Sequence, residues 1–231
     1  HKAYVTPYLR EQTLSRKLVL PIHRGRIWRI VPENWEPRKT PRLSQMSSTE
    51  LVSLLSSEDG WYRDMAQRLL VERDDPKTIR PLTELALKSE NPLGRFHALW
   101  TLEGIRSLKS DVLFALVGDR DPLVAATALR LLEPMAEKDR AVRGRLQQAV
   151  MKGWQGASMQ QVLQMALTAE ALDTDVAHDL LVRIATRYDT SALMRDAVVS
   201  SIGGSEFIFM QKLLATPPWK TQKPSREIFL E

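Results

Sequence analysis

The heptapeptide Ser89-Glu90-Asn91-Pro92-Leu93-Gly94-Arg95 returns along the chain about every thirty residues, and this recurrence determines the predicted architecture. Related heptapeptides occupy residues 57–63, 119–125 and 189–195. In each of them a short helix is expected to end, a polar or acidic turn follows, and a second amphipathic helix begins. Arg63 and Arg195 are 132 residues apart, which is four periods of 33. A fixed period of that size indicates stacked helix pairs that bury their apolar faces against their neighbours.

The apolar spacing from residue 47 onward predicts about five and a half helix pairs. Ser47 or Ser48 can cap a first helix that contains Leu51 and Leu54, and its partner carries Tyr62 to Leu70. The further pairs are 78–88 with 93–105, 109–117 with 122–132, 139–152 with 158–172, and 174–187 with 193–202, followed by a helix over 205–215. Pro134 is expected to end the helix that precedes it. The predicted fold is all-α, a HEAT-like α-solenoid whose antiparallel pairs form a right-handed superhelix.

The first 46 residues differ from this repeat region. A short helix is expected over 8–17, and Arg26-Ile27-Trp28-Arg29-Ile30-Val31 alternates basic and apolar residues, which is typical of a β-strand. A lone strand needs partners, and these are expected upstream of His1. We therefore expect three parts: an exit segment and proline-rich connector over 1–46, a HEAT-like array over 47–215, and a linker or further repeat over 216–231.

Composition excludes several classes of function. The chain has no cysteine, which excludes disulfides, thiolate zinc sites and Cys-x-x-Cys-His haem attachment within these residues. No apolar run approaches the roughly 20 residues that span a membrane. The net charge of +5 arises from residues 1–48, which hold ten Lys/Arg and three acids, so residues 49–231 carry −2. The repeat region therefore lacks the clustered cations of a nucleic-acid surface.

Three stretches carry a resemblance to a known family: Pro7-Tyr8-Leu9-Arg10, Gly25-Arg26-Ile27-Trp28-Arg29-Ile30-Val31 and His97-Ala98-Leu99-Trp100-Thr101-Leu102-Glu103-Gly104. The chain resembles the exported bacterial proteins called PVC-type haem-binding or membrane-bound dehydrogenase-like proteins. These have a propeller similar to sorbosone dehydrogenases, then HEAT repeats, then a c-type cytochrome domain.

The resemblance implies a location for the chain, two partners and a parent activity. This chain would be a middle piece, with an upstream β-propeller and a downstream domain of the same polypeptide, or another protein, as partners. It implies a periplasmic or other extracytoplasmic location and a parent that oxidises a sugar-like substrate. Haem c or quinone is expected only in parts of the parent outside this chain, and no cofactor or catalytic residue is expected within it.

Arginines near the repeated turn are the first candidate interaction residues. Arg63, Arg95 and Arg195, with the acids before them, could line a groove for an acidic ligand. The alternative is a ladder that caps helix ends and bridges neighbouring repeats, with acids favoured at helix N-termini by the helix dipole. We favour the ladder.

His97, Trp100 and Trp61 are the remaining candidates. His97 lies one helical turn from Trp100, and it could be an acid–base group or a ligand. No second histidine or cysteine stands at ligand spacing, so a core or interface position is favoured and no metal site is predicted. Tryptophans at 35, 154 and 219 are expected to fill junctions between repeats.

The sequence thus predicts a non-catalytic scaffold or interaction module rather than an enzyme. The alternative of another class is a HEAT-like DNA glycosylase or nucleic-acid-binding module with a basic concave face, and the charge of −2 argues against it. A free-standing adaptor for peptide or protein partners is a third possibility.

Overall fold

The computed structural model describes residues 5–18, 30–34 and 41–221. The chain divides into two compact units, 1–41 and 42–231. In the first unit, α1 (Pro7–Ser15) begins after Thr6, whose hydroxyl accepts a hydrogen bond from the Leu9 amide. Pro7 is suited to this first helical position because its missing N–H would have no partner there. The predicted strand over 26–31 lies largely outside the described residues, and the three-part domain division stays a prediction.

The second unit is an array of helix pairs. The first helices of the pairs are α2 (Ser48–Leu54), α4 (Ile79–Lys88), α6 (Ser110–Leu116), α8 (Arg140–Gly153), α10 (Thr174–Arg187) and α12 (Glu206–Ala215). The second helices are α3 (Gly60–Arg73), α5 (Pro92–Gly104), α7 (Pro122–Lys138), α9 (Met159–Thr168) and α11 (Ala192–Ser200). A short helix, α13 (Pro217–Thr221), follows α12. The fold is therefore the all-α solenoid that the repeat period predicts.

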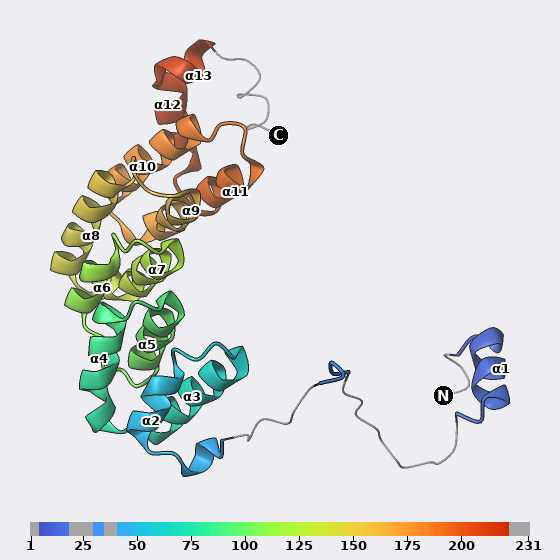
Figure 1. Cartoon of the computed structure of the whole chain (residues 1–231). Coiled ribbons are helices and arrows are strands. Elements are labelled where there is room, and N and C mark those ends of the chain that lie inside the picture. The colour runs from blue at the N-terminus through green and yellow to red at the C-terminus, as the bar shows by residue number, and fades with distance from the viewer. Residues whose placement is uncertain (1–4, 19–29, 35–40, 222–231) are drawn as a thin grey trace. The chain divides into compact units, whose positions relative to one another are not determined.

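The second helices form a continuous row, in which α3 contacts α5, α5 contacts α7, α7 contacts α9, and α9 contacts α11. Figure 1 shows this row beside the row of first helices. Leucine and alanine fill the space between the rows; Leu82, Leu99, Leu113 and Leu129 are almost fully buried. The core is thus one ribbon of apolar contacts along the array rather than a single globular centre.

Polar caps fix where the second helices begin. The Asp59 carboxylate accepts from the Trp61 amide, the Asn91 side-chain oxygen from the Leu93 amide, and the Asp121 carboxylate from the Leu123 amide. Each cap satisfies a backbone donor that has no partner within its own helix. The repeated turn is therefore also the start signal of each of these helices.

The prediction that Pro134 ends its helix is wrong, because α7 continues to Lys138. Proline removes the hydrogen bond to the carbonyl four residues earlier, which belongs to Arg130. Both residues lie on the exposed side of α7. A carbonyl on that side can be hydrated, so the helix continues past the proline.

Small residues leave a hollow between the third and fourth pairs. It has a volume of about 610 Å³, and its lining includes Gly118, Gly153 and Gly156 together with Leu129 and Met165. A methyl group added to Gly118 or Gly156 would meet nothing within 4 Å. Gly153 and Gly156 belong to the turn of the fourth pair, which lacks the acid and the arginine of the repeated heptapeptide.

Candidate functional site

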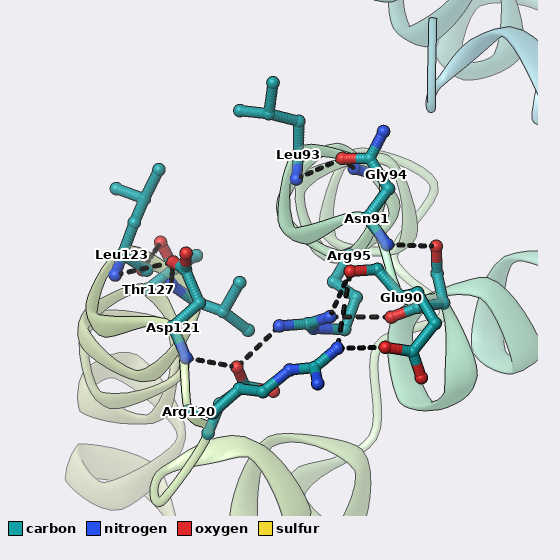
Figure 2. A network of polar contacts seen from close by, with 12 residues as sticks. Glu90, Asn91, Leu93, Gly94, Arg95, Arg120, Asp121, Leu123 and Thr127 are labelled. Carbon is teal, nitrogen blue, oxygen red and sulfur yellow. Dashed lines mark hydrogen bonds and ion pairs between the residues drawn. The ribbon is translucent and has the colours of Figure 1, made fainter.

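The best-defined polar network joins the second and third helix pairs around Arg95 (Figure 2). Arg95 is only 3% exposed. One terminal nitrogen donates to the Ser89 carbonyl at 2.6 Å, and the other forms an ion pair with Asp119 at 2.7 Å. The same Asp119 oxygen also accepts from the Asp121 amide at 2.8 Å. The guanidinium therefore closes its own turn and binds the next turn along the array.

A second ion pair bridges the same two turns but lies in solvent. Arg120 pairs with Glu90, and their side chains are 67% and 89% exposed. This hydrogen bond to Arg120 lowers the pKa of the Glu90 carboxyl. Surface pairs of this kind contribute little to stability, whereas a buried pair is costly to break. The two neighbouring arginines thus differ in their importance for the joint.

Arg63 repeats the local role of Arg95 one pair earlier. Its Nη1 donates to the carbonyls of Ser57 and Glu58 at 2.6 and 3.0 Å, which are the residues six and five positions before it. Arg95 donates to Ser89 and Glu90 with the same offsets. The two arginines differ in their partner on the next pair, because Arg63 reaches His97 on α5.

His97 lies buried between α3 and α5. Its Nε2 accepts from Arg63 Nε at 3.3 Å, and its Nδ1 lies 2.7 Å from the Gln67 side-chain oxygen. Because arginine can only donate, Nε2 must be the acceptor and Nδ1 must carry the proton, so the ring is neutral. Burial lowers the pKa of His97, the Arg63 charge lowers it further, and Asp64 acts in the opposite direction. A neutral histidine with both nitrogens occupied bridges two repeats.

Beside His97, a groove runs between α3 and α5. It has a volume of about 430 Å³, and Trp100, Val71 and Gly104 line it. Carboxylates of Asp64, Glu72 and Glu103 also line it, with Arg68 and Gln67. A methyl group on Gly104 would lie 2.7 Å from a Val71 methyl, so the absence of a side chain there lets the two helices approach. This groove is the candidate binding surface of the array.

The candidate residues from the sequence therefore fall into four places. Arg63, His97 and Trp100 share the joint between α3 and α5, and Arg95 lies at the next joint. Arg195 lies on α11, where it pairs with Asp196 at 3.5 Å. Trp61 is the second residue of α3 and is 55% exposed. The functional role of all six residues stays a prediction.

Of the three junction tryptophans, Trp154 and Trp219 are buried. The Trp219 indole donates to the Thr186 hydroxyl at 2.9 Å. Trp35, like His1 and His23, lies outside the described residues. His178 lies 2.9 Å from the Ser205 hydroxyl.

Sequence reasoning missed two side-chain pairings and one surface feature. It did not pair Asp119 with Arg95 or Gln67 with His97, since the separations of 24 and 30 residues follow no fixed spacing. Exposed apolar side chains stand at the second position of four second helices: Trp61, Leu93, Leu123 and Leu193, which are 55%, 36%, 37% and 54% exposed. Leu93 and Leu123 point away from the arginine network in Figure 2. Aligning the repeats by their caps would have revealed this row.

No metal site or membrane-spanning element occurs among the described residues. No group of three or more His, Asp or Glu within 5–18, 30–34 and 41–221 is placed to hold a metal ion. In the same ranges, no helix has the length and apolar character to cross a membrane.

Comparison with known proteins supports the architecture. Residues 48–133 match the family described as HEAT repeats, which covers the first three helix pairs. None of the curated proteins compared with the chain matches it. A crystal structure described as that of an engineered protein is 19% identical, over 80% of this chain and 96% of its own, with a TM-score of 0.37. That likeness is too low to carry an argument. The stacked pairs define the class of fold, an all-α solenoid, and its first three pairs match HEAT repeats.

Proposed function

We propose that the chain is a non-catalytic HEAT-repeat scaffold that holds other protein domains through surface complementarity. One observation carries this proposal: the arginines at the first two joints are engaged by the chain's own turns and by the next helix pair. Arg63 and Arg95 both bind carbonyls of the turn that precedes them, and both reach the next pair. They thus serve the stack, while the groove and the exposed apolar row remain as surfaces for a partner.

We further propose that this scaffold connects a β-propeller to a downstream domain in an exported dehydrogenase-like protein. The support is the resemblance of Pro7–Arg10, Gly25–Val31 and His97–Gly104 to that family. The scaffold would then be periplasmic, and haem c or quinone would belong to the neighbouring domains. Its task would be to fix the distance between the oxidising site and the electron acceptor.

The gene sequence on both sides of this chain tests the second proposal. We expect a β-propeller upstream and a Cys-x-x-Cys-His motif downstream. A start codon directly before His1 and a stop codon directly after Glu231 would overturn the proposed parent.

Binding tests the scaffold itself. The purified chain is titrated by calorimetry with the propeller and the downstream domain that the gene encodes, or with co-purifying proteins if it encodes neither. Saturable binding without turnover of a sugar substrate supports the scaffold. Turnover by the chain alone would refute it.

A further inference from the structure

The groove between α3 and α5 differs from an ordinary helix–helix furrow in its uncompensated charge. Three carboxylates line it, of Asp64, Glu72 and Glu103, against one cation, Arg68. Arg68 is already occupied, because its Nε lies 2.6 Å from Glu72. Within the described part of the chain, the side chains of Asp64 and Glu103 form no ion pair with any residue. Two negative charges therefore face the groove without a protein partner.

The wall of the groove adds an aromatic surface to this charge. Trp100 lines the groove and is half-buried, and its ring meets Phe96 edge-on with a centroid distance of 6.3 Å. Trp100 therefore packs against an aromatic residue of its own helix. Indole faces attract cations, and tryptophan is the strongest of the aromatic side chains in this respect. A planar guanidinium can stack on such a face while it donates to carboxylates at the rim.

The apolar surface continues from the groove along α5. Leu93, Phe96 and Trp100 follow one another at intervals of three and four, so they share one side of the helix. Leu93 is 36% exposed and Phe96 is half-buried. A partner that places a basic side chain in the groove would lay its neighbouring apolar residues along this stripe.

We propose that this groove docks a segment of a partner protein by taking up an arginine side chain, with the guanidinium on Trp100 and between Asp64 and Glu103. The occupant is thus a basic, partly apolar polypeptide segment. His97, which contacts the groove residue Gln67, is neutral and adds no positive charge to compete with it. This inference rests on the proposed scaffold function and specifies the chemistry of one of its partners.

Two synthetic peptides test the proposal with the full 231-residue chain. Both carry leucine and one test position four residues apart in an alanine background. The test position is arginine in one peptide and citrulline in the other, which keeps the shape of the side chain and removes its charge. Binding is followed through the Trp100 indole N–H resonance by NMR, assigned with the Trp100→Phe variant. We expect the arginine peptide to shift this resonance saturably and to bind about tenfold more tightly than the citrulline peptide.

Charge variants locate the effect. The double variant Asp64→Asn with Glu103→Gln removes the two carboxylates that form no ion pair among the described residues, and it should abolish the preference for arginine. Glu137→Gln on α7 removes one negative charge away from this groove and should leave the preference intact. Far-ultraviolet circular dichroism verifies that each variant is folded.

The proposal is overturned if Trp100 does not respond to the arginine peptide, if the two peptides bind equally, or if Glu137→Gln is as damaging as the double variant. These outcomes concern one groove only. The proposed scaffold function would still hold if the chain bound its neighbouring domains. If the chain did not bind those domains, the result with the peptides would still apply to the groove.

Discussion

Replacing Arg95 by alanine should destabilise the array far more than any exposed arginine substitution. The change leaves Asp119, whose side chain is 11% exposed, as a nearly buried carboxylate without its counter-ion. Breaking a buried pair from one side costs about 3–5 kcal/mol. Domains of this size have a total stability of about 5–15 kcal/mol, so the loss is a large share of it.

Arg120→Ala is the matched control because Arg120 spans the same two turns. Its pair with Glu90 lies in solvent, so we expect a loss below about 1 kcal/mol. Urea unfolding followed by circular dichroism measures both variants, and the slope of each transition shows whether the array still unfolds cooperatively.

A double-mutant cycle isolates the buried pair. Arg95→Met and Asp119→Asn should each be costly alone, whereas the combination should cost about 2–3 kcal/mol less than their sum. Additive losses, or an Arg95→Ala loss close to that of Arg120→Ala, would refute the reasoning that a buried charge pair holds this joint.

Three further changes address other contacts of the array. Gly94→Ala places a methyl group 2.2 Å from the Ser56 hydroxyl. The cost of overpacking, about 1–3 kcal/mol, should exceed the gain in helix propensity of roughly 1 kcal/mol. Thermal melting should therefore show a lower midpoint. His97→Gln should flatten the decline of stability from about pH 7 to pH 5. The pKa of His97 is lowered in the folded state, so the unfolded chain takes up the proton first as the pH falls below 6.5. Urea unfolding at several pH values measures this, and an unfolding free energy that depends on pH as in the original chain would contradict it. Ser158→Ala removes a capping box with Gln161 and should cost about 1 kcal/mol in urea unfolding, with no change pointing to a cap that water replaces.

Local chemistry made most of the fold predictable. The cap, the proline and the apolar spacing of each pair are encoded within about ten residues, and α4 and α5 accordingly begin and end within one or two residues of their expected bounds. The prediction that Pro134 ends its helix was wrong for a reason that the neighbouring residues do not reveal. The effect of the proline depends on whether the carbonyl it leaves unpaired faces water, and this is decided by the packing of α7 in the array.

The candidate site was predictable only in part, because its partners come from different pairs. The period identified Arg63 and Arg95 as equivalent, and both bind their own turns in the same way. Their second partners, His97 and Asp119, lie 34 and 24 residues later, on a helix in one case and in a turn in the other. No sequence period encodes that difference. The groove beside Trp100 depends on Gly104 and Val71 in close approach, which is equally a product of packing.

The ribbon-like core has a consequence for how the array would part under tension. In a linear array each unit is held only by its neighbours, so one interface can open while the others stay folded. A pull on the two ends would therefore separate the pairs one joint at a time. Domains fastened to the two ends would then move apart stepwise.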